Sequence, residues 1–412
     1  MNKSPRLVAL ETLYSIFYDG SYSNIALDKA LSDIKENKAF ISALVYGVTE
    51  RKITLDYFID KYAQGRIKPK VRIVLWLGAY QLLFMDKVPS SASINESVKL
   101  VKEIKQDYYS KLVNAVLHKI DNDRQIPDDL SVKYSVPENL INMWKKQYGE
   151  DVLNEFLPCI NDKPPLFAIP NKKFVNSDEL LYELECDGIL GEAYDEFVLI
   201  ENANDLTDSK AFKNGLFYIE DLSSFNCANA LDALGDDVVL DMCSAPGGKA
   251  FTISQSMNNS GKIYCYDLHE HRLNLIKNSA KRLSIDNIFT DVNDATVYNE
   301  NIPKADKILC DVPCSGFGII RRKPEIRYKD LDSVKDLPQI QYKILETSSR
   351  YLKNGGRIIY STCTLNKKEN ENVVNKFLKD HSGYKLLKDK TVFPSTVGGD
   401  GFYYAIMVKN EN

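Results

Sequence analysis

The sequence predicts an α/β protein in which a doubly wound parallel sheet follows an all-helical region and a small α+β unit. From about residue 221 onward, short apolar runs typical of strands alternate with runs typical of helices, as in repeated βαβ units. Residues 1–130 instead carry apolar side chains at helical spacing, without strand-like alternation. Residues 131–220 contain clustered prolines and short β-type runs. A chain of 412 residues suggests two or three domains, and we expect the boundaries at these composition changes.

The first two regions differ in their local signals. Breakers such as Gly65 and Pro89 separate the helix-like runs of the first region. In the second region, a cluster of prolines between positions 137 and 170 indicates a hinge before short strands and one helix. Helices are predicted at 6–20, 39–63, 70–85, 94–104, 109–120 and 177–188, and strands at 165–171, 196–200 and 215–220.

The last region, residues 221–412, gives the parallel sheet. Most of its β-type runs are followed by a helical run, and only the final run, "GFYYAIMVK", has no helix after it. Because crossover helices cover both faces of such a sheet, its strands read as nearly continuous apolar runs. Strands are predicted at 237–242, 262–267, 305–311, 355–362 and 401–409, and a further strand region ends at "DVNDAT" before the 305–311 strand. Helices are predicted at 249–257, 270–283, 337–354 and 367–381.

Composition narrows the possible classes of protein. Hydrophobic residues make up 44% of the chain, but no uncharged apolar stretch approaches the roughly 20 residues of a membrane helix. The eight cysteines show no C-x-x-C spacing, which indicates reduced thiols and argues against a disulfide framework or a zinc site. We therefore expect a cytoplasmic, monomeric protein without a bound metal or a membrane contact.

Charge is informative only locally. The net charge of -4 gives no global signature of nucleic-acid binding. Two basic clusters stand out, "RKITLDYFIDKYAQGRIKPKVR" (Arg51–Arg72), in which aromatic residues are interleaved, and "RRKPEIR" (Arg321–Arg327). Each is either a solvated face or an RNA-binding surface. The candidate RNA contacts are Arg66, Lys68, Lys70, Arg321 and Arg322.

Four predicted strand ends carry residues suited to a cofactor. The first leads into "DMCSAPGGK" (Asp241–Lys249), whose glycines allow a tight turn before a helix. The G-x-G-x-x-G and G-x-x-x-x-G-K-[ST] patterns are absent, while Asp267 is placed for a ribose diol and Asp294 for an adenine amino group. Together these residues favour a binding site for S-adenosylmethionine, an adenosine with a cationic sulfonium. The alternative interpretation, that they are ordinary residues of unrelated turns, is less favoured for the whole set. The candidate cofactor residues are Cys243, Ser244, Ala245, Pro246, Gly247, Gly248, Lys249, Asp267, Asp294 and Asp311.

Two cysteines follow the ends of two separate predicted strands. Cys314 comes directly after "DVP" and Cys363 directly after "ST". A lone cysteine at such a position is usually a small buried hydrophobe. Two thiols beside one cofactor pocket instead indicate nucleophilic chemistry, in which a nearby cation such as Lys249 favours the reactive thiolate.

Methylation of cytosine at carbon 5 accounts for both thiols. Carbon 5 becomes nucleophilic only after a thiolate adds to carbon 6, and an acid near ring N3, here Asp311, assists that addition. The adduct must then lose the carbon 5 proton and expel the thiol, a step that gives a second cysteine a role. The residues alone do not decide whether Cys314 or Cys363 is the nucleophile.

Longer motifs carry a resemblance to a known family. "DMCSAPGGKA" looks like its cofactor loop, "DVPCSGFGIIRRKPEIR" like its Pro-Cys motif and "YSTCTLNKKENENVV" like its Thr-Cys motif. "IEDLSS" and "GGDGFYYA" resemble further segments, so that the matching motifs span about 219–405. The chain thus resembles the bacterial 16S rRNA (cytosine-C5) methyltransferases that carry a NusB-like N-terminal domain. In the N-terminal region the resemblance rests on helical pattern and on "RLVALETLYSIFYDGSYSNIALDKAL".

The resemblance implies a role for each part of the chain. It implies that residues 1–130 form a NusB-like RNA-binding domain, 131–220 a hinge and an RRM-like subdomain, and 221–412 a Rossmann-like class I methyltransferase domain. It also implies that Cys363 is the nucleophile and that Cys314 helps to release the product. S-adenosylmethionine would be the cofactor and 16S rRNA the substrate. None of the departures from the family pattern, such as Glu220 in place of Gln, removes a reacting group.

Two alternatives remain open from the sequence. One is an enzyme of the same class that methylates transfer RNA or another ribosomal site. The other is an inactive RNA-binding factor for ribosome assembly, built on the enzyme fold. The presence of Lys249, Asp311, Cys314 and Cys363 together argues against an inactive protein.

Overall fold

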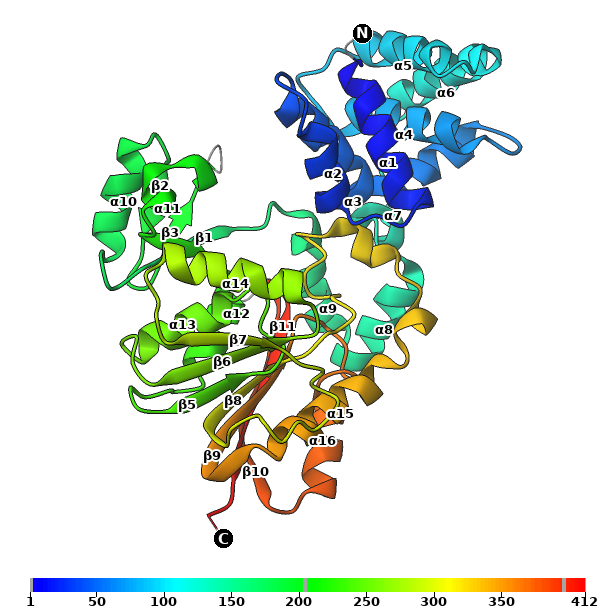
Figure 1. The fold of residues 1–412 in the computed structure, drawn as a ribbon. Coiled ribbons are helices and arrows are strands. Elements are labelled where there is room, and N and C mark those ends of the chain that lie inside the picture. Colours follow the sequence, from blue (N-terminus) through cyan, green and yellow to red (C-terminus); the bar gives the residue numbers. More distant parts are fainter. Residues whose placement is uncertain (1–2, 203–205, 395–397, 412) are drawn as a thin grey trace. The chain divides into compact units, whose positions relative to one another are not determined.

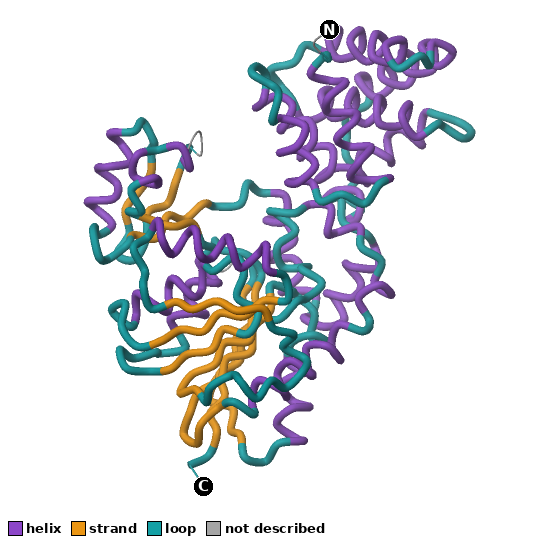
Figure 2. Tube along the Cα trace, in the orientation of Figure 1, coloured by secondary structure: helices purple, strands orange, loops and turns teal. Residues whose placement is uncertain are grey.

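The computed structural model describes residues 3–202, 206–394 and 398–411. The chain divides into two compact units, a helical unit (Met1–Asp162 with Ile320–Lys329) and a sheet unit (Lys163–Ile319 with Asp330–Asn412). Figures 1 and 2 show the helices of the first unit and the strands of the second. This division differs from the expected boundary near residue 130, and it places a short segment from the C-terminal half of the chain in the helical unit.

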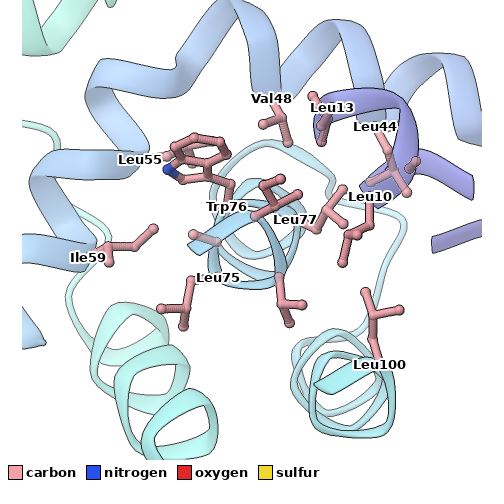
Figure 3. Packing of buried hydrophobic residues seen from close by; sticks show 14 of the residues in the cluster. Leu10, Leu13, Leu44, Val48, Leu55, Ile59, Leu75, Trp76, Leu77 and Leu100 are labelled. Atoms are coloured by element: carbon pink, nitrogen blue, oxygen red, sulfur yellow. The ribbon is translucent and has the colours of Figure 1, made fainter. Parts of the chain in front are cut away.

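The helical unit is built around a buried helix. Helix α4 (Pro69–Phe84) is apolar on nearly all sides, so other helices must surround it. Figure 3 shows Trp76 and Leu77 of α4 packed among leucines of its neighbours. The helices before residue 130 are α1 (Pro5–Tyr18), α2 (Ser23–Leu31), α3 (Lys38–Tyr62), α4, α5 (Ser90–Glu103), the 3-10 turn η1 (Asp107–Tyr109) and α6 (Ser110–Asn122).

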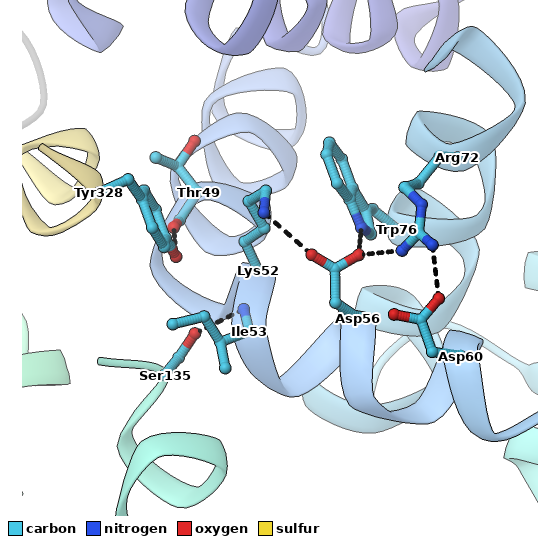
Figure 4. A network of polar contacts seen from close by, with 9 residues as sticks. All are labelled: Thr49, Lys52, Ile53, Asp56, Asp60, Arg72, Trp76, Ser135 and Tyr328. Atoms are coloured by element: carbon cyan, nitrogen blue, oxygen red, sulfur yellow. Dashed lines mark hydrogen bonds and ion pairs between the residues drawn. The ribbon is translucent and has the colours of Figure 1, made fainter. Parts of the chain in front are cut away.

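Polar contacts at the edge of this core tie α3 to α4. Asp56 accepts hydrogen bonds from Lys52 at 2.9 Å and from the Trp76 indole at 2.7 Å. Arg72 of α4 also pairs with Asp56 and reaches Asp60 one turn further along α3 (Figure 4). Because these acids lie on one face of α3, they fix the register between the two helices.

Residues 131–162, expected as a hinge, are mostly helical. They form α7 (Leu130–Tyr134), α8 (Glu138–Tyr148), α9 (Glu150–Phe156) and the 3-10 turn η2 (Leu157–Asn161). Pro137 is the N-cap of α8, and Pro158 lies in the first turn of η2. Both are positions at which a missing N–H does not break a helix. The prolines therefore mark where helices begin rather than where they are absent.

The segment Ile320–Lys329 belongs to the helical unit although it follows Cys314 in the sequence. Within it lies the 3-10 turn η4 (Pro324–Tyr328). Arg327 is 1% exposed and donates hydrogen bonds to the Glu50 carbonyl at 2.8 Å and the Ser135 carbonyl at 3.1 Å. The Tyr328 hydroxyl donates to the Thr49 carbonyl at 2.8 Å (Figure 4). These contacts anchor the segment against α3 and the C-terminal end of α7.

The small α+β part has the strand and helix order β-α-β-β-α-β. Its antiparallel sheet has the order β2-β3-β1-β4, which is the arrangement of ferredoxin-like and RRM-like domains. Its elements are β1 (Leu166–Pro170), α10 (Ser177–Cys186), β2 (Gly191–Ala193), β3 (Val198–Ile200), η3 (Leu206–Asp208), α11 (Lys210–Lys213) and β4 (Phe217–Ile219).

Both faces of this small sheet are covered. Ala168 and Phe217 pack with its own helices, α10 and α11. On the other face, Phe167, Ile169 and Tyr218 pack into the core of the larger sheet. RRM domains stack RNA bases on an open sheet face, and here that face is occupied by packing within the sheet unit.

The larger sheet has the order β10-β11-β9-β8-β5-β6-β7 in the described residues. Strands β7, β6, β5, β8 and β9 run parallel, and β11 and β10 complete the sheet as antiparallel strands. The predicted doubly wound α/β fold is confirmed, although β10 was not predicted. The strands are β5 (Val238–Asp241), β6 (Lys262–Asp267), β7 (Ile288–Val292), β8 (Ala305–Asp311), β9 (Leu352–Thr362), β10 (Tyr384–Val392) and β11 (Phe402–Lys409).

Helices cover both faces of this sheet. One core combines the β5 and β6 side chains Val239 and Ile263 with residues of the first three helices of the region. The other combines Leu240 and Ile308 with the last two helices. The chain order reverses between β5 and β8, which places the switch point, where ligands bind in such sheets, at the ends of these two strands. The helices are α12 (Leu222–Asn229), α13 (Gly248–Ser256), α14 (Glu270–Arg282), α15 (Leu337–Ser349) and α16 (Glu371–Asp380), with η5 (Leu331–Val334) before α15.

None of the helices in the described ranges combines the length and apolar character that crossing a bilayer requires.

Candidate active site

The two predicted cysteines meet at the carboxyl ends of neighbouring strands. Strands β8 and β9 are parallel and paired so that Asp311 lies opposite Ser361. Each chain then turns away from the sheet, carrying Cys314 and Cys363 with it. The two Sγ atoms are 3.2 Å apart. The sequence predicted both positions, and the strand register explains why residues 49 positions apart come into contact.

The contact between the thiols affects the protonation of Cys314. The hydrogen bond to Cys363, followed by burial, raises the pKa of Cys314 well above its usual value. Cys314 therefore keeps its proton at neutral pH. Either sulfur can be the donor in this contact.

Lys249 and Asp311 form an ion pair next to the thiols. The Lys249 ammonium lies 2.7 Å from one carboxylate oxygen of Asp311, and the Ser361 hydroxyl donates to the other at 2.9 Å. Burial opposes the charge on Lys249, but Asp311 and Glu220 overcome it and raise the pKa of the ammonium above its usual value. Lys249 is therefore a fixed cation that orients Asp311 at the end of β8.

A cavity of about 380 Å³ opens beside this ion pair. The volume is typical of small-molecule sites. Its walls come from the loop after β5, from the end of β4 and from Asp311. Of the predicted cofactor residues, Cys243, Ser244, Ala245, Pro246, Gly248, Lys249 and Asp311 line it.

Two glycines shape the loop between β5 and α13. Gly247, the N-cap of α13, has a φ of 109°, in the left-handed region that favours glycine. A Cβ atom on Gly248 would lie 2.9 Å from the Glu220 carboxylate. The second glycine thus allows a buried acid to approach the backbone of the cofactor loop.

Two buried acids that line the cavity were not predicted as site residues. Burial raises the pKa of Glu220 to about 7, although Lys249 lowers it, and burial likewise raises the pKa of Asp241 to about 7. Interactions with the Ser244 hydroxyl and the Cys243 backbone lower the pKa of Asp241 in part, but neither Asp241 oxygen makes a well-formed hydrogen bond among the described residues. Asp241 ends β5, and Glu220 directly follows β4 of the small sheet, so position at a strand end is a signal that could have found both.

Asp267 and Asp294, also predicted from strand ends, lie outside the wall of this cavity. Asp267 is buried at the end of β6, where Arg272 pairs with it at 3.0 Å and also donates to the Ala245 carbonyl at 2.7 Å. Asp294 lines a separate open hollow and accepts hydrogen bonds from Thr296 two residues further on. Asp267 is thereby connected to the cofactor loop, and Asp294 serves a local turn.

The two basic clusters differ in accessibility. Arg66, Lys68 and Lys70 are exposed in the turn before α4 and at its start. In the second cluster Arg321 is 7% exposed, and Arg322 is partly buried. Burial leaves Arg321 little surface with which to meet a phosphate, so the first cluster is the better candidate for an RNA contact.

Comparison with known proteins gives the family. A model of the family "16S rRNA methyltransferase RsmB/F" matches residues 228–408, and one of the NusB family matches residues 3–122. A probable ribosomal RNA small subunit methyltransferase B from Bacillus subtilis is 33% identical, over 98% of this chain and 99% of that protein. The chain belongs to the RsmB/F methyltransferase family. The predicted family resemblance and its enzyme class, S-adenosylmethionine-dependent methyltransferase, are confirmed.

Further relatives agree with this RsmB/F assignment. A protein of the same name from Synechocystis is 30% identical over 93% of this chain and 90% of its own. The crystal structure of the protein PH0851 matches 99% of this chain and 100% of its own at 27% identity, with a TM-score of 0.83. A methyltransferase homologue from Pyrococcus horikoshii matches 68% of this chain with a TM-score of 0.60 at 26% identity.

The residues of this RsmB/F chain fit S-adenosylmethionine. The cavity is of ligand size, and both the Asp241 carboxylate and the loop after β5 line it. Its lining combines four acids with two cations, Glu220, Asp221, Asp241 and Asp311 with Lys249 and Arg282. An excess of acceptors and negative charge suits a cationic ligand that carries hydroxyl and amino donors.

Proposed function

We propose that this protein methylates carbon 5 of a cytosine in 16S rRNA, with Cys363 as the nucleophile and Cys314 assisting release. The observation that carries the proposal is the pair of thiols 3.2 Å apart at the tips of β8 and β9. The shared family of 16S rRNA methyltransferases supports the substrate. The protein would act as a cytoplasmic monomer.

The raised pKa of Cys314 supports the assignment of roles. A thiol that keeps its proton is a poor nucleophile, so Cys314 suits a later step and Cys363 suits the attack. Cys363 then adds to carbon 6 of the cytosine, and the electron density moves to carbon 5. Once Cys363 is bonded to carbon, it no longer shares a thiol hydrogen bond with Cys314, so the main cause of the raised Cys314 pKa disappears. Cys314 is then able to act in the release step.

Release requires a balanced elimination. A proton acceptor removes the proton on carbon 5, the electrons of that C–H bond form the carbon 5–carbon 6 double bond, and Cys363 departs as a thiolate. Asp311, oriented by Lys249 and Ser361, is placed to hold the cytosine through the ring nitrogen N3. When bound, S-adenosylmethionine supplies the methyl group as an electrophile on a cationic sulfur. The loop 243–249 and the acids around it would hold the cofactor beside the thiols.

RNA binding is assigned to the helical unit and its basic residues. Arg66, Lys68 and Lys70 are exposed. The Lys68 ammonium lies 5.9 Å from the Tyr109 ring centre, and the Lys70 ammonium lies 5.6 Å from the Tyr14 ring centre. Such cation and aromatic surfaces bind phosphates and unstacked bases. The target cytosine would be unpaired or flipped, because a stacked base cannot reach thiols at the ends of strands.

The proposal is tested by bisulfite sequencing of ribosomal and transfer RNA from cells with and without the protein. We expect one or more 5-methylcytosines of 16S rRNA to disappear in its absence. Unchanged 16S rRNA together with a lost signal in transfer RNA would support the same chemistry on another substrate. Unchanged methylation everywhere would favour an RNA-binding assembly role.

The first prediction from this site concerns Asp267. Asp267→Ala is expected to weaken S-adenosylmethionine binding by roughly 1.5–3 kcal/mol, the cost of losing a charge-assisted hydrogen bond to the ribose. The change also frees Arg272, which contacts the cofactor loop, so Arg272→Met serves as the control for an indirect effect. Isothermal calorimetry decides: an unchanged affinity in Asp267→Ala removes this residue from the site.

The second prediction concerns salt. Affinity for a 16S rRNA fragment should fall steeply as salt rises, because each lysine or arginine that contacts a phosphate releases counterions. Replacing Arg66, Lys68 and Lys70 together by glutamine should reduce the slope of log Kd against log salt by about two to three. Filter binding at several salt concentrations measures this slope. If the triple variant keeps the original slope, the cluster is only a solvated surface.

The third prediction concerns pH. Glu220 and Asp241, each with a pKa raised to about 7, are neutral below that pH and ionised above it. The affinity for the cationic cofactor should therefore increase several-fold from pH 5.5 to pH 7.5. Glu220→Gln should reduce this increase, whereas the exposed control Glu183→Gln should not. Calorimetric titration at four pH values measures the effect, and a flat profile in the wild type would contradict it.

A further inference from the structure

The fully buried carboxylate of Glu369 contacts the residue that follows Cys314 in the chain. Glu369 is 0% exposed in the turn before α16. Its oxygens accept hydrogen bonds from the Ser315 backbone N–H at 2.9 Å and from the Ser315 hydroxyl at 2.6 Å. The side-chain amides of Gln341, at 2.9 Å, and Asn366, at 2.8 Å, also donate to it. A carboxylate with donors on every side compensates the cost of burying its charge.

These contacts fix both neighbours of Cys314. On one side, Ser315 donates twice to Glu369. On the other side, the Gln341 amide that donates to Glu369 also donates to the Pro313 carbonyl at 2.9 Å. The backbone on either side of Cys314 is thus attached, directly or through one amide, to the same carboxylate.

The next residue in the chain does the same for Cys363. The side-chain oxygen Oδ1 of Asn370 accepts a hydrogen bond from the Thr362 hydroxyl at 2.6 Å. The side-chain nitrogen Nδ2 of Asn370 donates to the Thr364 backbone carbonyl at 2.9 Å. Asn370 is 0% exposed, as is Thr362. The residues before and after Cys363 are therefore both bound to Asn370.

We propose that Glu369 and Asn370 are positioning residues for the two thiols, Glu369 for Cys314 and Asn370 for Cys363. Being adjacent, they set the spacing between the two loops as well as the place of each loop. A hydrogen bond of 2.7 Å between the Ser315 and Thr364 hydroxyls joins the two halves. This inference rests on the proposed function, in which the two thiols serve different steps.

The assignment predicts opposite defects from two isosteric changes. Glu369→Gln replaces one acceptor oxygen by an NH2 group that faces the donors of Ser315, Gln341 and Asn366. Because two donors cannot pair, the loop that carries Cys314 is loosened, while the contacts of Asn370 remain. Cys363 can then still attack and carbon 5 can still be methylated, but release is impaired. Asn370→Asp places an oxygen against the Thr364 carbonyl and loosens the Cys363 loop, so the attack itself is impaired. Displacing a reacting group by about 1 Å can cost on the order of 100-fold in rate.

The experiment uses the full-length protein, 16S rRNA and the cofactor, followed by a denaturing gel and a single-turnover methyl-transfer assay. Glu369→Gln should accumulate a covalent protein–RNA band, as Cys314→Ala is expected to do, with single-turnover methyl transfer within about tenfold of wild type. Asn370→Asp should show no band and lose on the order of 100-fold in methyl transfer. The exposed change Glu183→Gln should behave as wild type. Melting temperature and cofactor affinity establish that each variant is folded.

Two milder changes keep the test decisive if an isosteric variant does not fold. Gln341→Met removes the amide that joins Glu369 to the Pro313 carbonyl and should raise the amount of trapped band. Thr362→Val removes one contact to Asn370 and should lower methyl transfer without a band. If both members of a pair slow methyl transfer equally and neither traps RNA, the assignment is overturned, because the network then supports the site only as a whole. A missing band in Cys314→Ala would instead contradict the proposed roles of the cysteines.

Discussion

Cys314→Ala is expected to remain joined to its RNA substrate through Cys363. The nucleophile is intact in this variant, so addition to carbon 6 and methyl transfer to carbon 5 proceed. What the variant lacks is the neighbouring thiol, 3.2 Å from Cys363, that assists elimination. The methylated RNA should therefore accumulate as a slowly migrating band on a denaturing gel, dependent on both cofactor and RNA.

Cys363→Ala should show the complementary behaviour. Without its thiol nothing adds to carbon 6, and carbon 5 is not activated, so methyl transfer should fall below detection with no covalent band. RNA and cofactor affinity should stay near wild type, because the side chain is small and its loop is held by Asn370. The double variant should also lack the band. A band in Cys363→Ala that requires Cys314 would reverse the two roles, and full activity in both single variants would exclude covalent catalysis.

Arg327→Met is expected to destabilise the helical unit by roughly 3 kcal/mol. The guanidinium is buried, and its Nη1 donates to the backbone carbonyls of Glu50 and Ser135 and to the side-chain oxygen of Asn161 at 2.9 Å. Its Nε and Nη2 have no hydrogen-bond partner among the described residues. Methionine fills a similar volume but removes these three hydrogen bonds of Nη1. It also removes the positive charge that lowers the pKa of Glu50, an acid whose pKa burial has already raised.

Urea unfolding followed by circular dichroism measures this loss. The control is Arg124→Met, which removes an exposed arginine paired with Asp121 at the end of α6, and which should cost less than about 1 kcal/mol. If Arg327→Met is as stable as this control, the buried hydrogen bonds contribute little, and the segment 320–329 is held by its apolar contacts instead.

Most of the sheet unit was predictable from sequence because its elements are local. Four of the five parallel strands in the described residues are short apolar runs with a helix after them, β7 being the exception, and such a pattern can be read without knowledge of the fold. Strand β10 was missed because "YKLLKDKTV" is rich in lysine, as suits an edge strand. Residues 131–162 were interpreted as a hinge because proline was taken as a breaker, whereas Pro137 and Pro158 lie at helix starts.

The site was predictable where its residues end parallel strands. Asp311, Cys314 and Cys363 follow this rule, since parallel strands bring their carboxyl ends to one edge. Glu220 was noted only as a departure from the family pattern and not among the cofactor residues, because it reaches the cofactor loop from a separate small sheet. Glu369 lies in a turn with no signal of its own. Arg321 was grouped with surface cations by its neighbours in sequence, and only the packing of 320–329 reveals its burial.

The contribution of residues 320–329 to the helical unit limits how this protein can be divided or recombined. The matched NusB region ends at residue 122, yet α7 to α9 and a segment from beyond Cys314 complete the same packed body. A single cut after residue 122 therefore yields no pair of intact fragments, since the C-terminal piece would carry Arg327 without the Glu50 carbonyl that accepts from it. Exchange of the N-terminal domain with another helical module would succeed only if the new module also supplied a backbone carbonyl that accepts a hydrogen bond from Arg327, as Glu50 does here. The catalytic part and its helical partner are consequently expected to be inherited together.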